Sequence, residues 1–262
     1  MKQSQAKKRD NAMTNKILMG LIALVLGLLF LEILIVHSKN EQQKNASNQV
    51  QTARIMANGD LLYHDGLYMS ALQADGSYDF TENFTYVKPW LQQADLVLGD
   101  FEGTINPDYP LSGYPLFNAP QSVTAAIKDA GYDVMDLAHN HILDSGLEGA
   151  FTTADAFKKV GIDPVGVYEK PVRDKAPLLI KNVNGIKVAI LSYAYGYNGL
   201  ESNLTDKEVA DHLSNLDEKR MKAEIQRAEK EADITVIMPQ MGVEYRLEPT
   251  DEQVKLLSLI HI

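Results

Sequence analysis

Residues 96–103 read LVLGDFEG, an apolar run that is followed at once by two carboxylates, Asp100 and Glu102. A short apolar run that ends in glycine and charged residues is typical of a buried strand that reaches the edge of a sheet. Residues 54–60 read RIMANGD and repeat the pattern, because this run also ends in Gly-Asp, at Asp60. We therefore predict two strands that each deliver an acidic side chain to the end of the strand.

Strands and helices alternate along the rest of the chain. Predicted helices cover residues 84–93, 122–130, 147–160, 216–232 and a stretch from residue 250 onward, and predicted strands cover residues 134–137, 164–166, 178–183, 186–192 and 234–238. Asn184-Gly185, between two of these strands, is a strong signal for a two-residue hairpin turn. The alternation predicts an α/β fold in which helices cover a sheet, with the site in loops at the carboxyl ends of the strands.

Polar side chains follow several of the predicted strands. Beyond Asp60, Asp100 and Glu102, they are His139, Asn140, His141, Asp144, Gln240 and Glu244. Carboxylate oxygens suit hard divalent cations, whereas imidazole suits zinc, iron or manganese. The chemistry of the set Asp60, Asp100, Glu102, Asn140 and His141 fits a metal cluster, with His139 as a further ligand or as an outer partner of one.

Each of these features also has a purely structural explanation. Gly-Asp after a strand is common in turns and helix caps. His-Asn-His could be a polar loop, and Asp144 could cap the helix that is predicted from residue 147. Only the joint occurrence of these residues at successive strand ends favours a metal site.

The amino-terminal segment predicts a membrane anchor. Residues 17–36 are twenty in number and carry one charge, Glu32, and a helix needs about 20 apolar residues to cross a bilayer. Basic residues gather in residues 1–16, so we expect this end in the cytoplasm and the domain from residue 53 outside the cell. Residues 37–52 are polar and predict a linker. A cleaved signal peptide is the alternative, but its apolar region is typically shorter and ends at small residues.

Composition excludes disulfide bonds and argues against nucleic-acid binding. The chain has no cysteine, so disulfides cannot stabilise a domain outside the cell. Its formal net charge is −10, whereas a nucleic-acid-binding protein needs a basic face to neutralise phosphates. We therefore expect no nucleic-acid partner.

Four segments carry a resemblance to a known family: residues 58–60, 99–103, 137–146 and 242–245. They resemble the bacterial capsule-synthesis family CapA, whose members include poly-gamma-glutamate synthesis accessory proteins. The resemblance runs from about residue 53 to about residue 256, and the element Asn-His-x-x-Asp-x-Gly is its most specific part. That family is similar to the calcineurin-like metallophosphoesterases. This implies a four-layer αββα sandwich and a dinuclear site for divalent ions such as Mn, Fe, Zn or Mg.

The resemblance also implies roles for individual residues. Asp60 matches a first-motif ligand, Asp100 matches the bridging acid, and Glu102 lies beside it in the acidic motif. Asn140 matches a ligand, and His141 matches the imidazole that contacts the phosphate or scissile group, where it could protonate a leaving group.

The chain departs from the family pattern in two places. Gln240-Met241-Gly242 stands where the family usually has His-Trp-Gly, and an amide oxygen is a weaker ligand than imidazole for a transition metal. Related chains continue to a Gly-His-x-His motif with further ligands. Residues 257–262 resemble an artefactual tail, so we expect the natural protein to be longer and the sandwich to be incomplete.

By this resemblance the protein acts in the synthesis, anchoring or export of a capsule or other surface polymer. Its expected partners are the cell membrane, an anionic surface polymer and a membrane synthase or export complex. One form is an enzyme that performs metal-assisted hydrolysis of a phosphoester or amide. The alternatives are a non-catalytic accessory subunit that binds the polymer in the same cleft, and an anchored α/β domain without a metal.

Overall fold

The computed structural model describes residues 31–39 and 50–260. Contacts divide the chain into two units, Met1–Gln51 and Thr52–Ile262. In the first unit, residues 31–39 are helical, and most of the predicted anchor lies outside the described residues. Within the ranges that the structure describes, no helix combines the length and apolar character that a membrane crossing requires.

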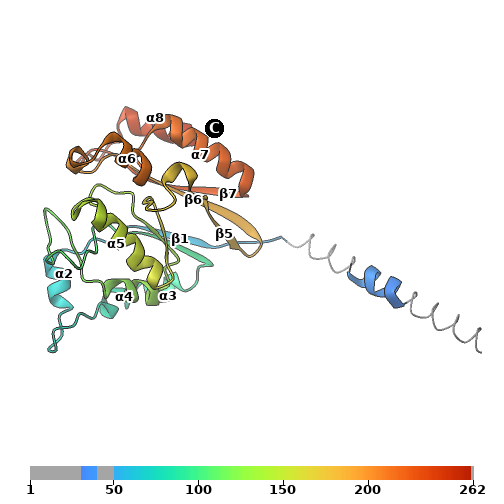
Figure 1. Ribbon diagram of the computed structural model, residues 1–262. Helices are drawn as coiled ribbons and strands as arrows, with labels where there is room; N and C mark the ends of the chain where they lie inside the picture. Colours follow the sequence, from blue (N-terminus) through green and yellow to red (C-terminus); the bar gives the residue numbers. More distant parts are fainter. Residues whose placement is uncertain (1–30, 40–49, 261–262) are drawn as a thin grey trace, which may run out of the picture. The chain divides into compact units, whose positions relative to one another are not determined.

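The first sheet of the second unit brings acidic residues to one edge. It is parallel, in the order β1 (Ile55–Asp60), β2 (Leu96–Asp100), β3 (Val134–Asp136) and β4 (Asp163–Val165) (Figure 1). Asp60 is in register with Asp100, and Asp100 is in register with Asp136. Because parallel strands end at the same edge of a sheet, three strands deliver a carboxylate to one place.

The second sheet has three strands. They are β5 (Leu179–Val183), β6 (Ile186–Ala194) and β7 (Ile234–Gln240), in that order. The predicted hairpin between β5 and β6 is confirmed, with Asn184 at φ 54° and Gly185 at φ 90°, the positive values that a tight hairpin turn needs. β7 runs parallel to β6 and places Gln240 beside Ala194.

Alternating side chains bind the layers together. In β2, Leu96 and Leu98 pack against the second sheet, while Val97 faces the opposite side and joins the core under the helices. In the same way, Val188 and Ile190 of β6 face the first sheet. The helices of the two outer faces are α4 (Val123–Ala130) and α5 (Gly146–Lys159) on the first sheet, and α7 (Glu218–Glu231) and α8 (Asp251–Ile260) on the second. The predicted α/β class with a parallel sheet is confirmed, and the layers run helix, sheet, sheet, helix.

The single helix predicted for residues 84–93 is wrong. The segment forms a short 3-10 turn, η1 (Thr81–Phe84), and one helical turn, α3 (Lys88–Leu91). Pro89 lies in the first turn of α3, where its missing N–H costs nothing, but inside a longer helix it would break a hydrogen bond. The proline therefore makes residue 88 the start of a helix rather than its middle.

Four short elements were not predicted: α2 (Asp65–Ser70), η2 (Arg173–Lys175), η3 (Leu200–Asn203) and α6 (Asp206–His212). A signal for α6 was present in the sequence. Thr205 and Glu208 form a reciprocal capping box at its start, a pattern that marks helix amino termini.

Candidate functional site

Asp60, Asp100 and Glu102 form an acidic cluster at the carboxyl ends of β1 and β2. Asp100 is 9% exposed, and its Oδ1 is buried without a hydrogen-bond partner. Burial, together with the charges of Asp136 and Asp60, raises the pKa of Asp100 to about 9. Burial and a hydrogen bond with Asp60 raise the pKa of Glu102 to about 7. Crowded carboxylates of this kind favour either shared protons or a cation.

Asp136, at the end of β3, is a further acid that the sequence reasoning missed. It is buried behind Asp100, and burial raises its pKa to about 7. Its Oδ1 accepts hydrogen bonds from the Ala138 N–H at 2.8 Å and from the Ser192 hydroxyl of β6. The residue therefore links the two sheets beneath the acidic cluster. Its position inside the predicted strand 134–137 gave no reason to separate it from the core.

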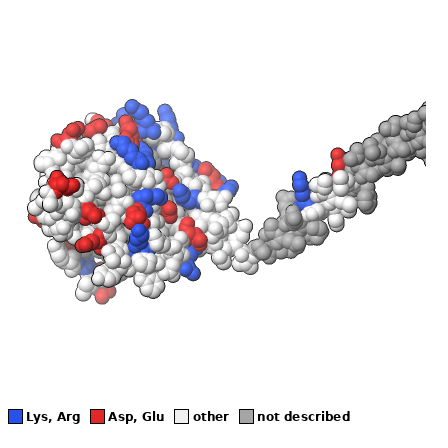
Figure 2. Space-filling view, turned by 90° about the horizontal axis from the view of Figure 1, so that it is seen from below, with Lys and Arg blue, Asp and Glu red and all other residues white. Residues whose placement is uncertain are grey.

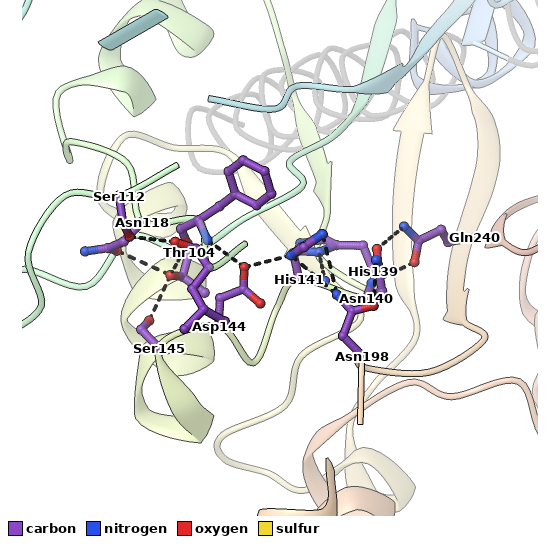
Figure 3. Close-up of polar contacts among 12 residues, drawn as sticks. Thr104, Ser112, Asn118, His139, Asn140, His141, Asp144, Ser145, Asn198 and Gln240 are labelled. Carbon is purple, nitrogen blue, oxygen red and sulfur yellow. Dashed lines mark hydrogen bonds and ion pairs between the residues drawn. The ribbon is translucent and has the colours of Figure 1, made fainter. Parts of the chain in front are cut away.

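His141 is held by Asp144. The imidazole Nδ1 lies 2.7 Å from Asp144 Oδ2, which also accepts a 2.6 Å hydrogen bond from the Phe117 N–H. Burial lowers the pKa of His141, but the hydrogen bond and charge of Asp144 outweigh this effect, and the pKa is raised overall. Asp144 does not cap α5, since Ser145 is the N-cap residue. The Asn198 Nδ2 lies 3.5 Å from both ring nitrogens, so a ligand that contacts Nε2 would meet Asn198 as well (Figure 3).

Asn140 joins three loops through its backbone and its side-chain amide. Its backbone N–H donates to Gln240 Oε1 at 2.7 Å, and Gln240 Nε2 donates back to Asn140 Oδ1 at 2.7 Å. Asn140 Nδ2 donates to Asn198 Oδ1 at 3.0 Å (Figure 3). Asn198 was also missed, because a lone asparagine after β6 matches no spacing pattern. Gln240 thus acts as a clamp from the second sheet onto the loop that carries His141.

Gln240→Met is expected to lower the free energy of unfolding by about 1–3 kcal/mol, because the buried N–H of Asn140 would lose its acceptor. Urea denaturation of the purified chain measures this change. The control is Gln93→Met, since the Gln93 side chain is exposed and bonds only to Pro89 O in its own helical turn. Equal, near-zero effects of both substitutions would contradict the clamp.

The remaining predicted residues occupy different positions. His139 is fully buried, and burial lowers its pKa to about 3, so it is a neutral partner whose Nδ1 accepts from the His141 N–H at 3.2 Å. Glu244 is exposed. It lines two adjoining hollows of about 660 Å³ and about 680 Å³, the first containing His141 and the second Gln240. Glu102 and Asn140 line both hollows as well, so all five residues border one open cleft.

The donor atoms of the cluster suit a hard divalent cation. Asp60, Asp100 and Glu102 offer carboxylate oxygens, and the unpartnered Asp100 Oδ1 is one of them. Within the described residues, no group of three or more His, Cys, Asp or Glu side chains is placed to hold a metal ion. The amide oxygen of Asn140 is engaged by Gln240, and His139 faces the core. Closing the acidic cluster around an ion therefore requires its side chains to move.

The first, parallel sheet carries acids at one edge, with a His–Asp pair beside them. It packs on a second sheet, and helices cover both outer faces. This arrangement is a metallophosphatase-like fold. The fold is similar to a Staphylococcus aureus crystal structure, provisionally assigned as a 5'-nucleotidase and solved with alpha-ketoglutarate. The two share 14% identity at a TM-score of 0.51, over 80% of this chain and 42% of the other. Residues 54–260 match the family described as bacterial capsule synthesis protein, PGA_cap. The chain belongs to this family.

Two curated relatives agree with this assignment. The chain is 30% identical over 179 residues to the capsule biosynthesis protein CapA of Bacillus anthracis, covering 65% of this chain and 43% of the relative. It is 26% identical over 252 residues to the PGA biosynthesis protein CapA of Bacillus subtilis, covering 95% of this chain and 64% of the relative. The matched part therefore spans about half to two thirds of these relatives. The predicted resemblance to CapA is confirmed.

Proposed function

We propose that the protein is anchored in the cell membrane and cleaves or transfers a phosphoester or amide bond during synthesis, anchoring or export of a surface polymer. The family assignment supports the link to capsule synthesis. The observation that carries the chemistry is the shared cleft, which Glu102 of the acidic cluster and His141 of the His–Asp pair both line. A cation site and a proton donor thus border the same space.

In this proposal Asp60, Asp100 and Glu102 hold a hard divalent cation. When bound, such an ion would polarise a phosphoryl or carbonyl oxygen and activate water. Asp136 lies behind the cluster and adds negative charge that strengthens cation binding. The exposed Asp60 closes the cluster on the solvent side.

The remaining groups position the substrate and move a proton. His141 presents Nε2 to the cleft and donates a proton to the leaving oxygen or nitrogen. Asp144 accepts a hydrogen bond from the Nδ1–H group, fixes the orientation of the ring and stabilises the imidazolium. The Phe117 ring packs edge-on against His141 at 4.7 Å between centroids and restricts its rotation.

A second candidate function is binding of an anionic polymer without catalysis. The observation that favours it is the hydrogen bond from Gln240 Nε2 to Asn140 Oδ1, because this bond occupies the oxygen through which Asn140 would bind a metal ion. In this form a single cation in the acidic cluster bridges the protein to carboxylates of the polymer. The protein would then work beside a membrane synthase.

Metal content and turnover, measured together, distinguish these proposals. We expect the purified full chain, loaded with Mn²⁺ and desalted, to retain about one ion per chain by elemental analysis, and Asp60→Ala to lose most of it. The control is Asp65→Ala, since Asp65 is exposed and paired with His64 outside the cluster. Retained metal with turnover of phosphoester or amide substrates supports the enzyme, and retained metal without turnover supports the binding role. A folded chain that retains no metal would overturn both.

The anchor has its own test. We expect the full chain to sediment with membranes and to require detergent for release, because residues 17–36 are long and apolar enough to cross a bilayer. Removing residues 1–36 should release the domain into the soluble fraction. A full chain that stays soluble would contradict the anchor without bearing on the metal.

A further inference from the structure

An exposed apolar patch lies on the segment that contains α3. Its members are Tyr86, Val87 and Trp90, which are 88%, 46% and 66% exposed. Phe84 and Leu91 of the same segment point inward and fix it to the core. Large aromatic side chains are seldom left this exposed together on a soluble surface unless they meet a partner.

The patch lies where the chain enters the second unit. Arg54 donates from its backbone N–H to Asp95 Oδ2 at 2.8 Å and from its guanidinium to Gln93 O at 3.3 Å. The Gln93 side chain in turn donates to the carbonyl oxygen of Pro89, the residue directly before Trp90. The Thr52 carbonyl accepts a bond from Asn184 Nδ2 at the β5–β6 turn. The amino ends of both sheets and the patch are therefore on the same side of the domain, opposite the acidic cleft.

Charged side chains are distributed unevenly over the surface of the domain. Between residues 85 and 94 the only charged side chain is Lys88, which is paired with Asp129 at 2.5 Å. On the visible face, Lys and Arg side chains lie among Asp and Glu on the half that carries the amino ends of the strands, and the other half carries mainly Asp and Glu (Figure 2). Lys128 and Lys158 lie in the last turns of α4 and α5 and are paired with Asp133 and Asp155.

We propose that Tyr86, Val87 and Trp90 rest in the headgroup region of the membrane that anchors the chain. This inference relies on the proposed anchor. Only residues 40–51 separate the described helix from Thr52, and these twelve residues span at most about 40 Å whatever their conformation. A patch that rests on the bilayer would leave the acidic cleft, at the opposite ends of the strands, open to the side away from the membrane.

The chemistry of the patch fits a lipid surface better than a second copy of the chain. Tyrosine and tryptophan are enriched at membrane interfaces, where a ring can be buried while its polar tip stays hydrated. The three side chains could bury only roughly 400 Å², which is about half of what each partner contributes to a standard protein interface.

The single tryptophan of the chain tests this directly, because all tryptophan fluorescence reports on Trp90. The full chain is reconstituted in vesicles of phosphatidylglycerol and phosphatidylethanolamine, with lipids brominated high on the acyl chains as quenchers. We expect brominated lipids to reduce the emission roughly twofold and acrylamide to quench less than it does in detergent. Tyr86→Ser with Val87→Ser should restore the emission.

The matched control is Tyr109→Ser, which removes another half-exposed tyrosine from a loop beyond β2 and should leave quenching unchanged. Emission that is insensitive to brominated lipid, in a chain that remains in the vesicle fraction, would overturn the inference and leave the anchor intact. Emission that changes with protein density in the vesicles but not with bromination would assign the patch to a second copy instead. A chain absent from the vesicle fraction would overturn the anchor and, with it, this inference.

Discussion

Asp144→Asn is expected to lower the turnover number about 10²–10⁴-fold while leaving metal content unchanged, because the carboxylate orients His141 and stabilises its protonated form. An amide in this position retains the 2.6 Å bond from the Phe117 N–H but cannot stabilise the imidazolium charge. The side chain of Asp144 is 1% exposed, so water does not replace the lost carboxylate. Initial rates on the best phosphoester or amide substrate, with elemental analysis of the same samples, measure both quantities.

The pH profile separates an orienting role from simple unfolding. Asp144 raises the pKa of His141, so the proton-donating form persists to higher pH in the parent chain. We expect the alkaline limit of turnover to move to lower pH in Asp144→Asn. Asp155→Asn is the control, since Asp155 is an exposed acid paired with Lys158. A profile that keeps its alkaline limit in Asp144→Asn would contradict the proposed role of the pair.

Local pattern was sufficient to predict most strands and helices of the fold, whereas only the family resemblance implied its four layers. Apolar runs ending in Gly-Asp located β1 and β2, and Asn184-Gly185 located the hairpin, because both signals depend on a few adjacent residues. The helix predicted for residues 84–93 was wrong, because Pro89 begins a helix there instead of lying within one. The pairing of β6 with β7 joins residues more than forty positions apart, and no local signal predicts it.

The candidate site was predictable only in part. The sequence identified the residues around His141, since they come from loops directly after predicted strands. It did not predict that Gln240 would bond to Asn140 across a hundred positions, or that Asp136 would lie beneath Asp100. The first relation depends on how the two sheets pack and the second on the register of β2 with β3, and a single sequence encodes neither in any local spacing. The metal assignments of Asp60, Asp100, Glu102 and Asn140 stay predictions.

Asp100→Asn is expected to stabilise the metal-free protein at alkaline pH and to abolish its stabilisation by cations. Asp100 has a pKa of about 9 in the fold, against an ordinary value of 3.8, so the folded state retains a proton that the unfolded chain releases. Below about pH 4 Asp100 is protonated in both the folded and the unfolded chain, and its full contribution to the free energy of unfolding is present. This contribution is lost as the pH rises toward 9. Each tenfold difference in proton affinity corresponds to about 1.4 kcal/mol, so the loss amounts to several kcal/mol.

Thermal unfolding of the full chain in chelator, at pH 5 and at pH 8.5, tests this prediction. The parent chain should melt at a clearly lower temperature at pH 8.5 and regain stability when Mn²⁺ is added, by about 2.7 kcal/mol at a hundredfold excess over the dissociation constant. Asp100→Asn should lose less stability than the parent chain between the two pH values, with the remaining loss due to Glu102 and Asp136, and should ignore Mn²⁺. The control is Asp95→Asn, because the hydrogen bond from the Arg54 N–H holds the pKa of this exposed acid low, which places its contribution at acidic pH only.

The sign of the Asp100→Asn effect distinguishes a functional cluster from a structural one. Acids that serve only the fold are paired with donors, so their removal destabilises the protein, as expected for Asp133, which accepts a 3.0 Å hydrogen bond from the Val97 N–H. Asp100 has an unpartnered buried oxygen and acidic neighbours, so its charge costs stability unless a cation binds. A variant that is less stable than its parent at pH 8.5 in chelator would show that the carboxylate is satisfied within the fold, and the cation would then have no reason to bind there. A more stable variant that no longer responds to Mn²⁺ would mean that the fold tolerates this strain at one position, where ion binding relieves it.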